Sequence, residues 1–348
     1  CTTLLPTPTI ADGSDYFDTL LYAGTGANQS ISGLGFGSAP DFVWIKRRNG
    51  AGQHVLTDSV RGTNKQLFSS LTNAEQTSTT GITSFDSNGF SLGTNVSPTG
   101  STNGSSSTYA AWCWDAGSST VSNTDGSVTS QVRVNQTAGF SIVSWTSSST
   151  SGNYDSIGHG LNALPGLVIT KRRSVADSWY SAHGFDLTQF GKLNSTDTFS
   201  TAGAAWGNGH TSSVIGMRVG NFVGANETMI AYCFAPVNQY SSFGSYEGNG
   251  SSDGPFVALS FRPALVIYKN VDTAYGWQIY DSKRDPHNVS DARLQPSSSN
   301  AEDTTTGLDM LSNGFKIRTN HARTNNSGDT FIYAAFAENP FQANGGLA

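Results

Sequence analysis

Short apolar runs alternate along the chain with stretches rich in glycine, serine, threonine and asparagine. No long segment has the spacing of apolar residues that is typical of an amphipathic helix. Short apolar runs bounded by turn residues are typical of β-strands. The pattern therefore predicts an all-β protein made of many short strands.

One of these apolar runs occurs three times with the same ends. A proline precedes the run and a lysine closes it, at Pro40 and Lys46, at Pro165 and Lys171, and at Pro263 and Lys269. Proline fixes its own φ and has no N–H donor, so it suits the first residue of a strand. The three runs predict three diverged copies of one unit.

Other positions keep the same register. Asp58, His183 and Asp281 each stand twelve residues after the closing lysine. Each copy also ends on an apolar strand, at residues 108–114, 228–234 and 330–336, and opens on one near Phe17, Phe140 and Phe243. The first and third copies share an Asn-Gly pair, at 88–89 and 313–314, which predicts a hairpin turn.

The spacing of the copies indicates the kind of unit. The three prolines lie 125 and 98 residues apart, which exceeds the period of common solenoid repeats and fits a β-sandwich of ~100 residues. We expect three tandem β-sandwich units of lectin or jelly-roll type, each with its own core, and closer coupling of units two and three. The predicted parts are an N-terminal connecting segment at 1–16, unit one at 17–117, a linker at 118–138, unit two at 139–237 and unit three at 238–348.

Composition narrows the function. The chain of 348 residues has a formal net charge of −6, which opposes sequence-independent binding of nucleic acid phosphates. No apolar stretch approaches the ~18 residues of a membrane-spanning helix, so we expect neither nucleic acid partners nor membrane insertion. The start at Cys1, without methionine or a signal-peptide pattern, indicates a fragment or a partly represented chain.

The strongest catalytic motif is the G-x-S-x-G sequence of residues 89–93, which fits the nucleophile elbow of hydrolases. It follows an Asn-Gly turn and alternates apolar and polar residues, as a strand does. In the other copies the place of Ser91 is taken by Lys316 and by Arg218. A position that accepts Ser, Lys or Arg is interpreted as a solvent-facing strand position.

Two Asp-x-x-Arg sequences offer a second candidate chemistry. Asp58 with Arg61, and Asp281 with Arg284, could act as acid and base, or could pair locally to fix a turn. Their recurrence, and His183 at the same place in copy two, favour the turn.

The three cysteines are an odd number and do not form a disulfide framework. Cys113 and Cys233 occupy one repeat position that holds Ala335 in copy three. A position where cysteine alternates with alanine in an apolar strand indicates a small buried packing residue.

We therefore predict a protein that is not an enzyme, with no catalytic, cofactor-binding or metal-binding residues and no cofactor. Two carboxylates that meet across a cleft, as in glycosidases, remain an alternative that sequence spacing does not test. The polar loops 97–107, 200–213 and 319–329 each precede a closing strand and are the expected contact loops. Deletion of residues 101–107 is expected to leave folding intact.

Several phrases resemble a tandem-repeat domain family of tailed phages, of the marine and cyanobacterial type. They include residues 42–46, 58–62, 85–93, 109–114, 243–246, 253–256 and 337–341, so the resemblance covers residues 17–341. Copy two departs from it, because it lacks the Asp-Ser-x-Arg and Asn-Gly-Phe phrases.

The resemblance implies a virion structural protein on the exposed particle surface, such as a tail fibre, tail spike or appendage subunit that attaches to the host. Its expected partners are other virion proteins, further copies of itself (a trimer, by analogy) and a host-surface glycan. The alternatives are a capsid decoration protein that binds only virion subunits and a polysaccharide-depolymerising tail spike. The position in the virion, the receptor, the host and the oligomeric state stay open.

Overall fold

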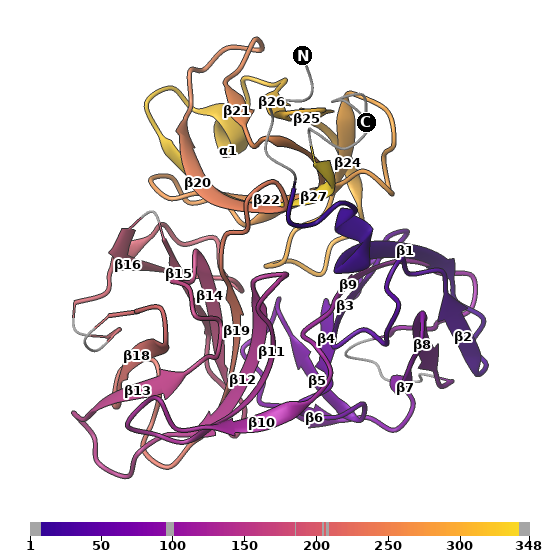
Figure 1. The fold of residues 1–348 in the computed structure, drawn as a ribbon. Coiled ribbons are helices and arrows are strands. Elements are labelled where there is room, and N and C mark those ends of the chain that lie inside the picture. The colour runs from indigo at the N-terminus through magenta and orange to yellow at the C-terminus, as the bar shows by residue number, and fades with distance from the viewer. Residues whose placement is uncertain (1–7, 95–100, 185, 204, 207–208, 341–348) are drawn as a thin grey trace.

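The structure is a computed structural model that describes residues 8–94, 101–184, 186–203, 205–206 and 209–340. Strands make up 47% of it and helices 2%, so the prediction of an all-β protein is confirmed. Cys1 lies outside the described residues. Figure 1 shows the strands in three groups around a common centre, and we call residues 17–117, 118–237 and 238–340 segments one, two and three.

Each segment has one main antiparallel sheet that faces this centre. In order across the sheet, segment one has β1 (Phe17–Ala23), β9 (Thr108–Trp114), β3 (Phe42–Arg47), β4 (Val55–Asp58), β5 (Lys65–Phe68) and β6 (Gln76–Thr77). In the same sense, segment two has β10 (Thr120–Asn123), β11 (Ser130–Asn135), β12 (Phe140–Thr146), β19 (Thr228–Phe234), β14 (Leu167–Arg172), β15 (Trp179–His183), β16 (Asp186–Lys192) and β17 (Ser200–Thr201). Segment three has β20 (Ser241–Glu247), β27 (Thr330–Pro340), β22 (Phe261–Asn270) and β23 (Gln278–Asp281).

The sheets share the register that the sequence phrases indicate. The strand that begins near each repeated proline pairs on one side with the closing strand, where Phe42, Leu167 and Leu265 lie opposite Trp114, Phe234 and Phe336. On the other side the same three residues lie opposite Asp58, His183 and Asp281. Cys113 and Cys233 also correspond, because they lie opposite Val43 and Val168.

A smaller sheet lies behind each main sheet. These sheets contain β2 (Gln29–Ser32), β8 (Gly89–Leu92) and β7 (Ile82–Asp86) in segment one, β13 (Tyr154–Gly158) and β18 (Val214–Arg218) in segment two, and β21 (Phe256–Ala258), β26 (Gly314–Ile317), β25 (Asp303–Leu311) and β24 (Ser290–Arg293) in segment three. A hairpin turn forms at each Asn-Gly pair, but the two turn residues are 87–88 and 312–313, because Asp86 pairs with Gly89 and Leu311 with Gly314. Among the described residues, short helices occur at η2 (Gly13–Asp15) and α1 (Ala322–Asn325).

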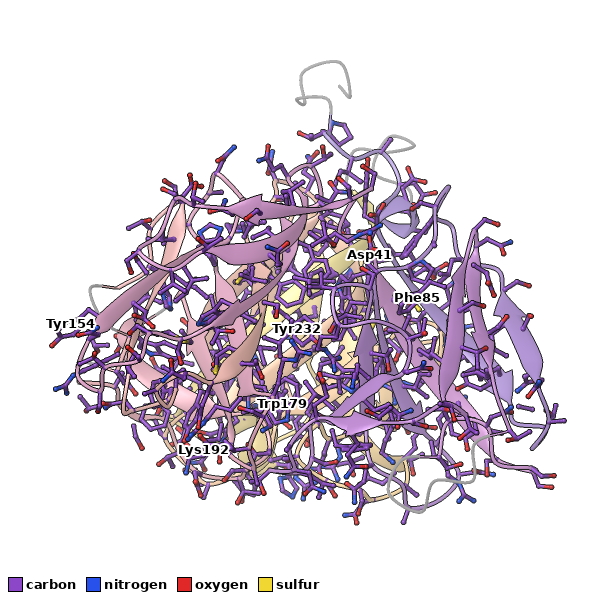
Figure 2. The ribbon with its side chains drawn as sticks, turned by 90° about the horizontal axis from the view of Figure 1, so that it is seen from below. Asp41, Phe85, Tyr154, Trp179, Lys192 and Tyr232 are labelled. Carbon is purple, nitrogen blue, oxygen red and sulfur yellow. The ribbon has the colours of Figure 1, made fainter. Side chains whose placement is uncertain are left out.

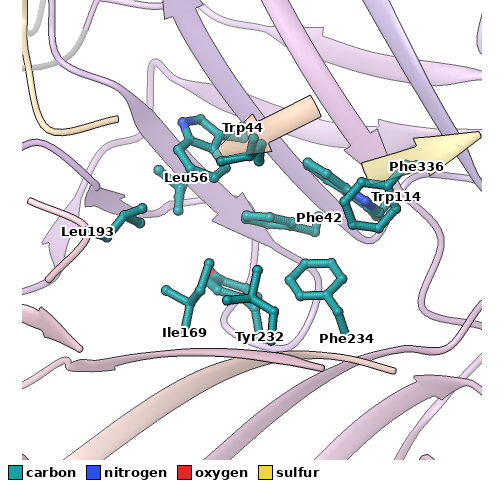
Figure 3. A pocket seen from close by; sticks show the side chains of 11 residues that line it. Phe42, Trp44, Leu56, Trp114, Ile169, Leu193, Tyr232, Phe234 and Phe336 are labelled. Atoms are coloured by element: carbon teal, nitrogen blue, oxygen red, sulfur yellow. The ribbon is translucent and has the colours of Figure 1, made fainter. Parts of the chain in front are cut away.

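The largest hydrophobic cluster joins all three segments. On β3, Phe42 and Trp44 point to this common core, whereas Val43 and Ile45 point to a cluster between the two sheets of segment one. The Phe42 and Tyr232 rings stack with their centroids 4.2 Å apart, and the ring centroids of Phe234 and Phe336 lie 5.6 Å apart. Aromatic rings of all three segments are therefore in contact (Figure 3). Figure 2 likewise places Trp179 and Tyr232 in the interior and Tyr154 at the periphery.

The expectation that each unit has a core of its own is met only in part, because a common core joins the three segments. Segments one and two do have separate clusters behind their main sheets. However, the main strands bury both faces, which is why their sequences are almost continuously apolar rather than alternating. The three segments therefore close into a ring instead of forming a string of independent units.

The expected linker at 118–138 is also not an extended connector. It forms β10 and β11, which pair with each other and then with β12 of segment two. The sequence from Ser130 to Asn135 alternates polar and apolar residues, and its Val132 is buried. This alternation is the pattern of a half-buried strand.

Candidate functional site

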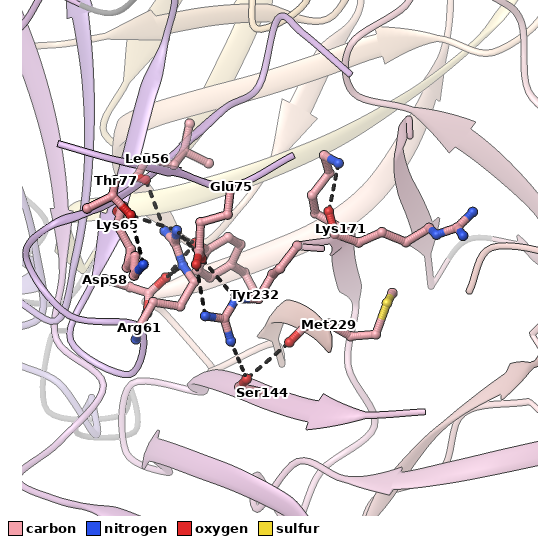
Figure 4. A network of polar contacts seen from close by, with 12 residues as sticks. Leu56, Asp58, Arg61, Lys65, Glu75, Thr77, Ser144, Lys171, Met229 and Tyr232 are labelled. Carbon is pink, nitrogen blue, oxygen red and sulfur yellow. Dashed lines mark hydrogen bonds and ion pairs between the residues drawn. The ribbon is translucent and has the colours of Figure 1, made fainter. Parts of the chain in front are cut away.

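Asp58, the first candidate acid, is fully buried at the end of β4. Its carboxylate accepts hydrogen bonds from the backbone N–H and the Nε of Arg61, at 2.9 and 2.5 Å. It also accepts one from the hydroxyl of Tyr232 in segment two, at 2.8 Å. The local Asp-Arg pair agrees with the interpretation as a fixed turn, but the contact with Tyr232 is a link between two segments (Figure 4).

Arg61 extends this link to a second carboxylate. Its guanidinium donates to the Leu56 carbonyl at 2.9 Å and forms an ion pair with Glu75 at 3.2 Å. Glu75 accepts two further hydrogen bonds from Arg173 of segment two, at 2.8 and 3.0 Å. Burial raises the pKa of Glu75, but the hydrogen bonds from Arg173 and the charge of Arg61 outweigh it and hold that pKa below its usual range.

The same arrangement recurs between segments three and one. Asp281 pairs with Arg284 and accepts a hydrogen bond at 2.9 Å from the indole N–H of Trp112, over whose ring Arg284 lies at 5.5 Å. Arg284 also contacts Glu302 at 2.9 Å, and Glu302 accepts hydrogen bonds from Arg48 of segment one at 2.8 and 3.0 Å. Trp112 and Arg48 hold the register positions of Tyr232 and Arg173.

A backbone hydrogen bond marks each of the three junctions of the ring. Glu75 N–H donates to the Arg173 carbonyl at 2.9 Å, Glu302 N–H to Arg48 at 2.8 Å, and Phe199 N–H to Val271 at 3.0 Å. We call these the one–two, three–one and two–three junctions. The third has no ion pair at these positions, and there His183 contacts the Tyr333 carbonyl at 2.9 Å.

These contacts define what the buried acids can do. The oxygens of Asp58 and Asp281 are occupied by an arginine and by an aromatic donor from the neighbouring segment. Neither aspartate lines the hollows on the surface of the described segments. A buried carboxylate held in this way by several donors from two segments fixes a junction.

Two of the three repeated lysines, Lys46 and Lys269, also reach across junctions. Lys46, Lys171 and Lys269 are buried, and burial lowers the pKa of each to about 8. Each ammonium donates to backbone carbonyls, which for Lys46 include Ser299 of segment three and for Lys269 include Thr196 of segment two. A lysine with a lowered pKa is a candidate nucleophile in general, but these three satisfy carbonyls of the interior.

Cys113 and Cys233 are completely buried and lie in two different hydrophobic clusters. Burial raises the pKa of both thiols, that of Cys233 to about 12. A thiol that stays protonated is neither a good nucleophile nor a metal ligand. The interpretation of these cysteines as packing residues is confirmed.

Ser91 lies on β8, in the small sheet of segment one. Its hydroxyl donates to Asp86 at 2.7 Å and lies 2.8 Å from the hydroxyl of Ser30 on β2. The residue is therefore part of a strand, as predicted, and does not lie on the strand-to-helix turn of a nucleophile elbow.

The expected contact loops are partly packed and partly exposed where the structure describes them, with residues 105–106, 211–213 and 327–328 exposed. Asn103 is fully buried, and its side chain bonds Thr25 N–H and the carbonyls of Ala27 and Gly93. Asn325, equally far before its closing strand, is also fully buried and bonds Asn249 and Ser251. The burial of Asn103 counts against the expectation that residues 101–107 can be deleted without harm. Residues 97–100 of the first loop lie outside the described residues.

Shallow hollows on the surface carry mostly neutral polar side chains. One of about 510 Å³ lies over the small sheet of segment one and is lined by Asn28, Gln29, Ser30, Thr83, Ser84, Ser91 and Leu92. Another of about 440 Å³ lies over segment two and is lined by Val128, Thr129, Gln131, Ser144, Trp145, Thr146, Arg173 and Thr228. A third, of about 200 Å³, lies between segments three and one. The cavity in the common core is only about 10 Å³.

In the part of the chain that the structure describes, no three His, Cys, Asp or Glu side chains are grouped as metal ligands. The helices of that part are too short to cross a bilayer.

The sequence phrases located the aspartates but not their partners in the neighbouring segments. Tyr232 lies 174 residues from Asp58, and Trp112 lies 169 residues from Asp281. One signal was present, because Tyr232 and Trp112 share a repeat position, as do Arg173 and Arg48. The repeat alone does not say which copy each of these side chains contacts.

One family model matches residues 12–340, and its description is a domain of unknown function (DUF7483). It spans all three segments as one domain. The search of the curated proteins found no match.

Proposed function

We propose that this chain, which belongs to the DUF7483 domain family, is a non-catalytic structural protein of a phage virion. In this proposal it is a tail fibre, tail spike or appendage subunit that is exposed on the particle and takes part in attachment to the host. Its three segments are three diverged two-sheet sandwich units of one ancestral type. The phrases shared with the phage family and the common register of the three main sheets support this origin.

The observation that carries the proposal is the use of the buried charges. Asp58, Asp281 and their arginines join segments, and the two-fold recurrence of this arrangement fits a requirement of assembly. Duplicated chemistry would instead need a pair of acids facing a cleft. A ring locked by side chains from all three segments suits a rigid subunit that withstands mechanical and solvent stress outside a cell.

The surface hollows suit the binding of a partner better than the catalytic conversion of a substrate. Two of the hollows are lined chiefly by hydroxyl and amide groups, which form neutral hydrogen bonds with sugars and with other proteins. Other virion proteins, further copies of the chain and host-surface glycan are the partners of this proposal. The trimeric state is an analogy with other fibres and spikes.

Electron microscopy of the particles tests the proposal most directly. Antibodies raised against the purified chain are expected to label purified particles of the virus that encodes it, at the tail or at an appendage. Fluorescently labelled chain is expected to bind the host cells. Labelling confined to the capsid, without binding to cells, would favour a decoration protein, and absence from the particles would overturn the proposal. Release of reducing ends from host polysaccharide by the purified chain would overturn its non-catalytic part.

A further inference from the structure

At each of the three junctions, the residue directly before the proline-to-lysine strand meets the neighbouring segment. We call these three places the rims of the junctions, and different side chains occupy them. Each rim is marked by a backbone hydrogen bond in the main sheet. Ser59 N–H donates to Asp41 O at 2.8 Å, Gly184 N–H to Gly166 O at 2.7 Å, and Ser282 N–H to Ala264 O at 2.9 Å. Asp41, Gly166 and Ala264 stand at one register position, directly before the strands β3, β14 and the corresponding part of β22.

Side chains fill the first two rims. At the one–two rim, Asp41 is buried, forms an ion pair with Arg133 of β11 at 2.6 Å, and accepts a hydrogen bond from Ala116 N–H at 2.8 Å. At the two–three rim, the ring of Phe243 lies directly on Gly166, where an added Cβ would stand 2.7 Å from it.

The three–one rim keeps a pocket of about 200 Å³. Ala264 stands where segment one has Asp41, and Thr19 stands where segment three has Phe243. Both replacements are smaller than the residues that fill the other rims. Phe17, Asp18, Ser282 and Lys283 complete the walls next to them, with Asp12 and Glu338 at the flanks.

Two residues of this pocket, Thr19 and Ser282, carry buried hydroxyl groups. Thr19 is 4% exposed and Ser282 is 5% exposed, and neither hydroxyl has a hydrogen-bond partner among the described residues. An unpaired buried hydroxyl costs free energy that a bound polar ligand would recover. Beside them, the Asp18 carboxylate accepts from Thr19 N–H at 2.7 Å and Gly35 N–H at 3.1 Å, and lies 3.6 Å from the Lys283 ammonium.

We propose that this pocket binds one neutral sugar unit of a glycan. This inference rests on the proposed function, for which it names the contact site. Hydroxyl groups of a sugar can both donate and accept, which matches a mixture of carboxylate, ammonium and hydroxyl groups. The apolar wall at Phe17 and Ala264 suits the C–H face of a pyranose ring.

Charge and size limit the other ligands. The lining carries Asp12, Asp18 and Glu338 against Lys283, and Arg262 forms an ion pair with Glu338 beside it. A net negative charge remains, which opposes a uronic or sialic acid. The described residues bring no three acidic or other metal-ligating side chains together, so the carboxylates are spread as they would be around a sugar and not gathered around an ion. Pockets for drug-sized ligands occupy about 300–1,000 Å³, so a pocket of about 200 Å³ fits a single sugar ring.

The test uses the whole chain and saturation-transfer NMR with a panel of methyl glycosides. The panel contains glucose, galactose, mannose, fucose and N-acetylglucosamine, with glucuronic acid as the anionic counterpart. We expect at least one neutral glycoside to bind and the glucuronide not to bind. Binding of the glucuronide alone, or of none of the panel at millimolar concentration, would overturn the proposal.

Variants place the binding in the pocket. The double variant Thr19→Val with Ser282→Ala removes both unpaired hydroxyls at nearly unchanged volume, so it is expected to fold normally and to bind about tenfold more weakly. Ser59→Ala is the matched control, because Ser59 holds the position of Ser282 at the filled one–two rim, and it is expected to bind as the parent does. Thr19→Phe copies the filling of the two–three rim and is expected to abolish binding.

Cell binding separates this inference from the proposed function. If the chain binds host cells and Thr19→Phe, shown to be folded by circular dichroism, binds them equally well, the pocket assignment is wrong while the attachment function stands. If neither the parent chain nor Thr19→Phe binds cells or the glycosides, both the pocket assignment and the attachment function are wrong. Loss of both activities in Thr19→Phe alone supports the pocket.

Discussion

The one–two and two–three junctions keep the same backbone contact but differ in their side chains. At the one–two junction Glu75 meets Arg173, and behind them Asp58 accepts a hydrogen bond from Tyr232. At the corresponding places of the two–three junction stand Phe199, Val271, His183 and Ala334. One charged and one largely uncharged set of side chains thus hold equivalent sheets together. Uncharged side chains take the place of the charged ones at the two–three junction. We therefore interpret the charged residues of the one–two junction as residues that hold the ring together.

The largest expected effect comes from breaking the charged network at its centre. Arg61→Met leaves Asp58 buried without its cation, so we expect a loss of about 3–5 kcal/mol in the free energy of unfolding. Arg284→Met should cost a similar amount at the three–one junction, because Arg284 makes the same contacts with Asp281 and Glu302. Urea denaturation measures both.

The matched control for these variants is Arg47→Met, on the half-buried side chain that closes β3 and donates a hydrogen bond to the Asn49 side chain. It should change stability by less than about 0.5 kcal/mol. A loss below about 1 kcal/mol for both Arg61→Met and Arg284→Met would mean that the charged junctions do not hold the ring.

The pH dependence of the free energy of unfolding tests the role of His183 at the largely uncharged two–three junction. Burial lowers the pKa of His183 to about 4, so the unfolded chain binds this proton more tightly than the folded chain. The stability from neutral His183 is therefore complete above its unfolded pKa of about 6.5 and is lost as the pH falls toward 4.

We expect His183→Gln, which keeps a donor for the Tyr333 carbonyl, to remove on the order of 2 kcal/mol of the stability difference between pH 7 and pH 4. Denaturation curves of both proteins across this range make the comparison. Parallel pH profiles of parent and variant would contradict the assignment.

A smaller effect is expected for the partly exposed ion pair between segments. A double-mutant cycle of Glu75→Ala and Arg173→Ala should give a coupling free energy of about 1–2 kcal/mol, reduced at 1 M NaCl. The same cycle with Phe199→Ala and Val271→Ala should give a coupling that salt does not reduce. If both cycles respond equally to salt, the two junctions do not differ in the way proposed.

Much of the local structure could be predicted from the sequence. The proline-to-lysine runs, the Asn-Gly hairpins and the register of Asp58, His183 and Asp281 are local patterns, and the structure has them at the expected places. The role of Cys113 and Cys233 followed from the same register. These predictions succeeded because periodicity and turn residues act over a few positions.

The closure of the ring could not be predicted in this way. Continuous apolar strands indicate burial on both faces, but they do not say what covers the second face. In this chain it is covered by another segment, through contacts such as that of Phe42 with Tyr232, 190 residues apart. Asn103 was missed for a similar reason, because a polar residue in a Ser-rich loop looks exposed until its four hydrogen bonds are seen.

Differential scanning calorimetry of the whole chain tests the central claim, that three segments share one core and form a closed ring. We predict one cooperative transition with a calorimetric enthalpy equal to the van't Hoff enthalpy, and an equal downward shift of all heat absorption in Arg61→Met. Separate transitions, only one of which moves in Arg61→Met, would show independent units and contradict the account.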